Sequence, residues 1–286
     1  MPRLHSPQIE ENIFKGIMLL STFVILASLG AILSTILVKG LPALSWEMLT
    51  RGPEGGYYIG KGGGILNAIL GSLLLGIGST VIALAVSLPI ALYLNLYLKR
   101  KSTFALAIRF ALDVLWGIPS VVYGAFGFTL MAAFGLRASL LAGMLTVALL
   151  ILPIMTRAID EVLKMIPLEL KEASLSLGAT RWETASKVIS RQALPGILTA
   201  ILMAFGRGVS DAAAVLFTAG FTDSLPYSLF KPVATLPLAV FFQLGTPFVE
   251  VQERGYASAL VLIMLVLGLS VLSRILSRRF ARHIVR

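Results

Sequence analysis

Two oppositely charged residues in an apolar stretch, Arg207 and Asp211, have types and a spacing that suggest chemistry. They lie four positions apart, so on a helix their side chains share one face and can pair. A guanidinium holds a phosphate-like anion through two parallel hydrogen bonds, and a neighbouring carboxylate would position it and keep it from trapping the anion. Two interpretations stay open: a structural ion pair, and a charged step on a translocation pathway for anions.

A polar segment over residues 160–193 is the second candidate for function. Leu170, Ala173 and Leu177 recur at helical spacing, and Gly178 is typical of the position just after a helix. Thr180 followed by Glu183 forms a capping box that begins a second helix. The pattern predicts two short helices broken at Gly178. They could dock a soluble partner, or they could rest as an amphipathic pair on a membrane surface.

The elements that position these residues are predicted to be membrane helices. Hydrophobic residues make up 57% of the 286 residues and charged residues 13%, and the mean hydropathy is +0.90. Charged residues make up about 25% of a soluble domain, and a membrane helix needs about 20 apolar residues. We therefore predict an all-α integral membrane protein, a single transmembrane domain over residues 1–286. Its six transmembrane helices are expected at roughly 14–38, 65–98, 105–134, 138–158, 195–219 and 256–277.

The distribution of Lys and Arg predicts how these spans are oriented. With the N-terminus inside, 17 basic residues fall in inside segments and 6 in outside segments. Basic residues favour the cytoplasmic side, so both termini are expected to be cytoplasmic. The net charge of +10 is explained by these loops, and we do not expect binding to nucleic acid. Within the spans a charge is costly; besides Arg207 and Asp211 only Asp113 remains, which beside Trp116 is interpreted as a helix cap or an interfacial anchor.

Other kinds of site find little support in the sequence. The chain has no cysteine, and its two histidines, His5 and His283, lie in the tails without a nearby second ligand, so no metal site is predicted. No arrangement of nucleophile and base stands out, and no catalytic residue or cofactor is expected in this chain. Since no nucleotide-binding motif is present, any ATP would be bound and hydrolysed by a partner chain.

The residues Glu172, Ala173 and Ser174, followed by Gly178 and by the pair at 194–195, resemble the EAA loop of bacterial ABC-importer permeases. Further segments resemble the phosphate permeases of the PstA type within this family, and the resemblance covers about residues 13 to 277. These segments are 63–69, 111–120, 177–184, 216–220 and 234–238.

The resemblance implies the type I importer permease fold and a role in ATP-driven uptake of inorganic phosphate. The implied partners are a homologous second permease subunit, a dimer of ABC ATPase subunits and an extracytoplasmic phosphate-binding protein, in the inner membrane of a bacterium. The implied site residues are Arg207 and Asp211 for the translocation pathway, and Glu172, Ala173, Ser174, Gly178, Thr180 and Arg181 for coupling to the ATPase.

The chain departs from the family pattern in five places. Ser174 replaces an alanine, residues 190–191 replace a Leu-Pro pair, Ser210 replaces a glycine, Asp211 replaces a glutamate, and Ala214 replaces a proline. The last three lie where the transported ion should pass, so importers of molybdate, sulfate or phosphonate stay open as alternatives. A secondary anion transporter and a regulatory or structural membrane protein are further alternatives.

Overall fold

The computed structural model describes residues 7–54, 63–99 and 102–280. Their regular structure is helical, apart from one isolated bridge between Pro53 and Gly63. The elements in chain order are α1 (Pro7–Ala43), α2 (Trp46–Thr50), α3 (Leu66–Leu96), α4 (Thr103–Gly117), α5 (Ser120–Ala133), α6 (Leu140–Lys164), α7 (Leu168–Ser176), α8 (Arg181–Glu183), the π-helix η1 (Thr184–Ile189), α9 (Ser190–Val209), α10 (Leu236–Leu244) and α11 (Val249–Phe280).

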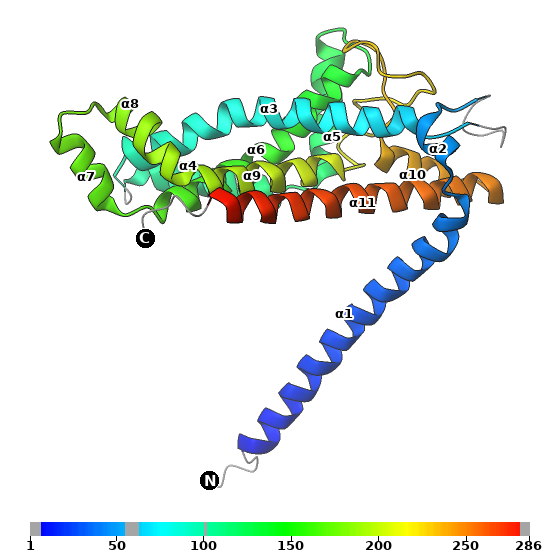
Figure 1. Ribbon diagram of the computed structural model, residues 1–286, viewed down its shortest axis with the longest axis horizontal. Helices are drawn as coiled ribbons and strands as arrows, with labels where there is room; N and C mark the ends of the chain where they lie inside the picture. Colours follow the sequence, from blue (N-terminus) through cyan, green and yellow to red (C-terminus); the bar gives the residue numbers. More distant parts are fainter. Residues whose placement is uncertain (1–6, 55–62, 100–101, 281–286) are drawn as a thin grey trace.

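The described part of the chain contains five helices long and apolar enough to cross a membrane, or six if one bent pair counts as a span. This confirms the predicted all-α membrane fold. In Figure 1 the long helices α3, α9 and α11 run side by side, with α7 and α8 at one end of the bundle and α2 and α10 at the other. The first and last helices extend beyond the predicted ranges 14–38 and 256–277, because polar residues continue each helix past its apolar run.

The third predicted span, 105–134, consists of two helices, α4 and α5, which meet at an angle of 98°. Pro119 has no N–H to donate and pushes the residue before it into an extended conformation, and Ile118 has φ −72° and ψ 130°. The Tyr123 hydroxyl donates to the Leu115 carbonyl across the break at 2.8 Å. A carbonyl released by the bend is therefore satisfied inside the protein, as a membrane environment demands.

The centre of the bundle is α6, which packs against α3, α4, α5 and α9. In its most apolar stretch 72% of the residues are buried, whereas none is buried in that of α1. Small residues on α3 let its neighbours approach closely. A Cβ at Gly71 would collide with the Ala234 carbonyl oxygen, and one at Gly76 would lie 2.6 Å from a methyl group of Val209.

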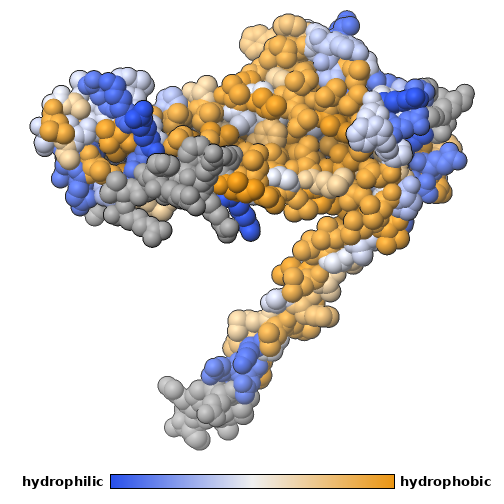
Figure 2. Space-filling view, viewed as in Figure 1, coloured by the Kyte–Doolittle hydropathy of each residue, from blue (hydrophilic) through white to orange (hydrophobic). Residues whose placement is uncertain are grey.

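Helix α1 leaves the bundle at the end that carries α2 and runs diagonally away from it (Figure 1). Its contact with the rest of the chain is at its C-terminal end, where Gly40 packs against the backbone of Tyr256 and Lys39 Nζ lies 4.9 Å from the Tyr256 ring. Apolar side chains cover most of the remaining length of the helix, and hydrophilic ones gather near its N-terminal end (Figure 2). This helix therefore presents an apolar surface that its own chain leaves uncovered.

The fifth predicted span, 195–219, is wrong at both ends. One helical stretch runs through α8, η1 and α9 from Arg181 to Val209, so the second helix of the polar segment is not short but continues into the membrane span. The helix ends early because the Asp211 carboxylate accepts the Ala214 N–H at 2.8 Å, which gives the backbone an alternative to helix. The following residues form a loop held to α3, where the Ser72 hydroxyl accepts the Leu236 N–H at 2.8 Å.

Candidate functional site

The predicted pair of Arg207 and Asp211 is present, but on different elements. Arg207 lies in the last turn of α9, and Asp211 lies two residues beyond the end of that helix. Arg207 Nη1 lies 2.9 Å from Asp211 Oδ2, and the side chains are 45% and 3% exposed respectively. Since Asp211 is also fixed by the Ala214 N–H, the buried carboxylate anchors a guanidinium that stays accessible.

Arg207 faces a groove between α9 and α11 with a volume of about 590 Å³. Two guanidinium groups line the groove, those of Arg207 and Arg274, together with several hydroxyl groups and apolar side chains. No carboxylate is among the described residues that line it, so its charged lining is positive and suits an anion. The lining residues are Thr199, Leu202, Met203, Gly206, Arg207, Ser210, Val266, Leu269, Ser270, Ser273 and Arg274.

The polar segment has the predicted break and capping box. Gly178 adopts φ +85°, a conformation that favours glycine, between α7 and α8. The Thr180 hydroxyl accepts the Glu183 N–H at 3.2 Å, and the Glu183 carboxylate accepts the Thr180 N–H at 3.1 Å. These interactions fix the turn at one end of the molecule, opposite to α2 and α10 (Figure 1).

The residues implied for ATPase coupling gather at this turn, partly on its surface. Glu172, Ala173 and Thr180 are exposed, and Leu177 is 89% exposed. The half-buried Ser174 instead makes a hydroxyl contact of 2.9 Å with Thr184, which joins α7 to η1. The surface of this turn thus combines an exposed large apolar side chain with exposed polar ones.

Two basic residues of the segment hold it to the end of α3. Lys171 Nζ donates to the backbone carbonyls of Leu96 at 3.1 Å and Asn95 at 3.4 Å. The Arg181 guanidinium lies 5.9 Å from the centre of the Tyr97 ring. The last carbonyls of a helix have no partner within the helix, and a lysine side chain commonly satisfies them.

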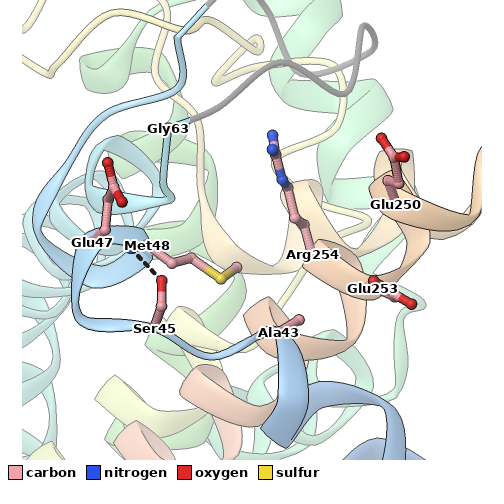
Figure 3. Close-up of a pocket in the computed structure, with 8 residues that line it drawn as sticks. All are labelled: Ala43, Ser45, Glu47, Met48, Gly63, Glu250, Glu253 and Arg254. Carbon is pink, nitrogen blue, oxygen red and sulfur yellow. Dashed lines mark hydrogen bonds between the residues drawn. The ribbon is translucent and has the colours of Figure 1, made fainter.

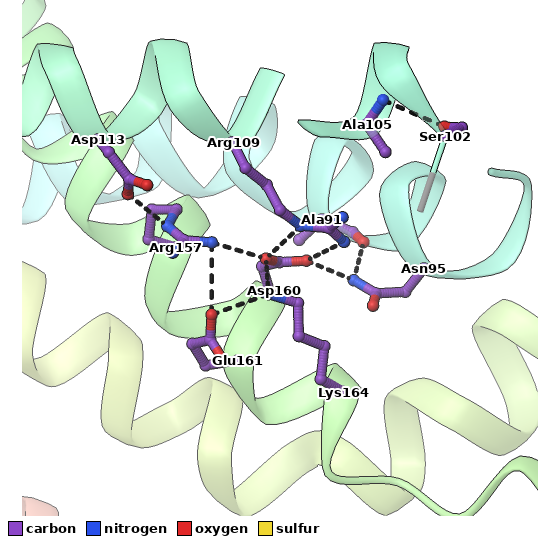
Figure 4. A network of polar contacts seen from close by, with 10 residues as sticks. All are labelled: Ala91, Asn95, Ser102, Ala105, Arg109, Asp113, Arg157, Asp160, Glu161 and Lys164. Carbon is purple, nitrogen blue, oxygen red and sulfur yellow. Dashed lines mark hydrogen bonds and ion pairs between the residues drawn. The ribbon is translucent and has the colours of Figure 1, made fainter. Parts of the chain in front are cut away.

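A buried cluster of charges lies next to this contact and was missed from the sequence (Figure 4). Asp160, on α6, has no exposed surface, and five donor atoms surround its carboxylate. They are Arg109 Nε at 2.9 Å and Nη2 at 3.0 Å, Arg157 Nη1 at 3.0 Å, Lys164 Nζ at 2.8 Å and Asn95 Nδ2 at 2.8 Å. The sequence prediction counts the three cations among the basic residues on the inside and places Asp160 in the polar segment 160–193. In the structure all four lie on the helices α4 and α6.

Asp113 is not a helix cap, because it lies in the interior of α4. Its Oδ1 atom lies 2.7 Å from Arg157 Nε, which adds it to the cluster around Asp160. A signal for this cluster was present in the sequence, since Arg157, Glu161 and Lys164 follow one another at spacings of three and four. Such a pattern predicts charged pairs along one continuous helix.

A second cavity, of about 390 Å³, lies where the end of α1, helix α2 and the start of α11 meet (Figure 3). Its charged lining consists of Glu47, Glu250, Glu253 and Arg254. The two ends of the molecule thus carry different polar surfaces. His5 and His283, the residues considered for a metal, lie outside the described part of the chain.

Comparison with known proteins places these features in context. Residues 86–286 match the family described as binding-protein-dependent transport system inner membrane component. The chain is 31% identical over 273 residues to the phosphate transport system permease protein PstA of Haemophilus influenzae, covering 96% of this chain and 95% of that protein. It is 35% identical over 245 residues to the PstA protein of Yersinia pestis, covering 86% and 82%.

Solved structures of transporters share the fold at low sequence identity. A bacterial alginate ABC transporter in complex with its alginate-bound periplasmic protein matches with a TM-score of 0.66 and 14% identity, covering 97% of this chain and 98% of that one. The MetNI methionine ABC transporter, in an inward-facing conformation, matches with a TM-score of 0.62 and 18% identity, covering 76% and 95%.

Proposed function

The chain belongs to the family of binding-protein-dependent transport system inner membrane components, and on this premise we propose that it is the transmembrane permease subunit of an ATP-driven importer of inorganic phosphate. The observation that carries the proposal is the match, over nearly the whole length of both chains, to proteins named phosphate transport permeases. Its relatives are named transport system permease proteins, so the chain is a transport subunit and not an enzyme.

The groove beside Arg207 supports phosphate as the substrate. A guanidinium presents two parallel N–H groups that match two phosphate oxygens. The carboxylate of Asp211, 2.9 Å from Arg207 Nη1, competes with the anion for the same donors. Binding is therefore strong enough to attract phosphate and weak enough to release it, as a pathway requires. A purely structural ion pair would have no need of a guanidinium open to a groove.

The family places the chain among ABC transporter components, and finer assignments of partners belong to the proposal. The segment 160–193, with its exposed Leu177, would dock on a dimer of ABC ATPase subunits. The uncovered apolar surface of α1 would pack against a homologous second permease subunit and lipid. An extracytoplasmic phosphate-binding protein would dock at the opposite end, near the cavity of Figure 3.

The protein is a multi-pass membrane protein, and we place it in the inner membrane of a bacterium with both termini in the cytoplasm. The bias of Lys and Arg towards the segments assigned as inside supports this orientation. The segment 160–193 then faces the cytoplasm, where ATP is available to the partner subunits.

Reconstituted transport tests the proposal. The chain would be purified with the ATPase and second permease that accompany it and incorporated into vesicles with the binding protein. Uptake of labelled phosphate should require ATP, resist competition by molybdate and sulfate, and disappear in Arg207→Ala. Arg137→Ala, which removes an exposed arginine outside the groove, serves as the control and should retain uptake.

Each alternative function gives a different result in the same assay. Competition by molybdate, sulfate or phosphonate would assign another oxyanion and direct attention to Ser210 and Asp211. Uptake by the chain alone and without ATP would indicate a secondary transporter. The absence of a co-purifying ATPase would refute the importer.

A further inference from the structure

The cluster around Asp160 joins three helices of the bundle through one carboxylate. Arg109 comes from α4, Asn95 from α3, and Arg157 and Lys164 from the same helix as Asp160. A buried charge is very costly without partners, so this arrangement strongly favours one relative placement of these helices. Moving α4 away from α6 would strand Arg109, and moving α3 away would remove the hydrogen bond that Asn95 donates to the carboxylate.

The cluster is electrically balanced. Its three cations, Arg109, Arg157 and Lys164, lie in contact with three carboxylates, those of Asp160, Glu161 and Asp113. Among the described residues that make these contacts, the formal charges therefore cancel. The cluster therefore suits a mechanical role better than a binding role.

Asn95 connects this cluster to the docking segment. Its side-chain amide donates to Asp160 at 2.8 Å, while its backbone carbonyl, and that of Leu96, accept hydrogen bonds from Lys171 on α7. Where α7 meets the end of α3, Asn95, Leu96 and Lys171 line a cavity of only about 20 Å³. A displacement of α7 would thus be passed to α3 and, through Asn95, to Asp160.

Two of the three helices that the cluster joins, α3 and α6, also contact the end of α9 that carries Arg207. Gly76 of α3 packs against Phe205 and Val209. On the other side, a Cβ at Gly208 would lie 3.0 Å from a methyl group of Val147 on α6. A shift of α3 with α6 would therefore change the surroundings of the last turn of α9.

Resting on the proposed function, we propose that Lys171 and Asp160 are positioning residues that transmit the movement of the docked segment to the anion pathway. Lys171 couples α7 to the C-terminal end of α3. Asp160 holds α3, α4 and α6 together so that they move as a unit against α9. Neither residue touches the transported anion in this arrangement.

The test is the ratio of phosphate taken up to ATP hydrolysed, measured with the reconstituted complex. Lys171→Met should leave co-purification with the ATPase and ATP hydrolysis intact and lower this ratio roughly tenfold, within the range found for mutations that alter coupling between sites. Lys171→Arg should retain most of the ratio, because its guanidinium can reach the same carbonyls. Lys99→Met removes an exposed lysine near the same end of α3 and should leave the ratio unchanged.

A cross-link separates a mechanical link from a purely structural role. The chain has no native cysteine, so Lys171→Cys and Tyr97→Cys can be combined and bridged with a short bifunctional thiol reagent. Uptake per ATP should be low before bridging and should recover once the bridge replaces the lost lysine contact. The single variant Lys171→Cys, treated in the same way, should stay low.

Three results would overturn the inference. Lys171→Met could transport as efficiently per ATP as the unaltered complex, it could fail to bind the ATPase, or the bridge could leave the ratio low. If the unaltered complex hydrolyses ATP but moves no phosphate, the proposed function fails and the inference falls with it. If the unaltered complex transports and Lys171→Met is equally coupled, the inference alone is wrong.

Discussion

Replacing Asp160 with asparagine removes the central charge of the buried cluster while keeping its size. Arg109 Nε and Nη2 lie 2.9 and 3.0 Å from this carboxylate, and the arginine side chain is only 9% exposed. The variant therefore leaves a buried guanidinium without its counter-ion, and removing one partner of a buried pair costs about 3–5 kcal/mol. Arg157 and Lys164 are more exposed and still contact Glu161, so we expect Asp160→Asn to cost about 3 kcal/mol, at the low end of that range.

The measurement is the unfolding of the purified protein in detergent, followed by the fluorescence of its three tryptophans. Asp160→Asn should lower the unfolding midpoint, and adding Arg109→Met should restore part of the loss, because it removes the stranded charge. Neighbouring residues of one network give coupling energies of about 0.5–3 kcal/mol in such double-mutant cycles. Asp223→Asn, at an exposed carboxylate, should change stability by less than about 0.5 kcal/mol.

The reasoning would be refuted if Asp160→Asn were as stable as the unaltered protein. It would equally be refuted if the effects of Asp160→Asn and Arg109→Met were additive, because the two groups would then not interact. Added salt should change the result little, since a buried pair is screened far less than a surface pair.

Three further substitutions test the turn between α7 and α8 and the packing of α3. Gly178→Ala meets open space but must adopt φ +85°, so it should cost roughly 1–2 kcal/mol and weaken binding of the ATPase in a pull-down, whereas Gly268→Ala, also in open space, should not. Thr180→Ala removes the side-chain cap at the start of α8 and should cost about 1 kcal/mol, seen as a lower unfolding midpoint. Gly71→Val places a Cβ against the Ala234 carbonyl oxygen, so a normal yield of folded protein would contradict the packing described.

Most helices could be predicted because apolar runs mark them and because helix-breaking and capping residues mark their ends. Residues 65–98 contain no charge, and the corresponding helix covers Leu66–Leu96. The break at Gly178 and the capping box at Thr180 are local signals that need no tertiary information. The roles of the site residues in transport and coupling stay predictions.

Two features depended on contacts that a single sequence does not display. The run after Asp211 stays apolar, so hydropathy continues the fifth span to 219, whereas the chain turns away after Val209. In the cluster, Asp160 contacts Arg109, 51 positions away in the sequence, and Asn95, 65 positions away. The prediction counts the basic residues of this cluster only as residues on the inside, so it misses the cluster. A helix that continues past its apolar stretch, as α6 does, brings its charged residues against neighbouring helices.

The groove beside Arg207 and the cluster around Asp160 differ in their balance of charge, and this difference suits them to different tasks. At the groove, Asp211 neutralises one guanidinium from the side, and Arg274 remains as a second cation in the lining. A groove with apolar walls and an excess of positive charge raises the local concentration of anions. At Asp160 the cations and carboxylates balance, so an anion gains nothing there and the groups are free to hold helices together. Under the proposed function, attraction of the anion and transmission of movement thus need not compete for the same residues.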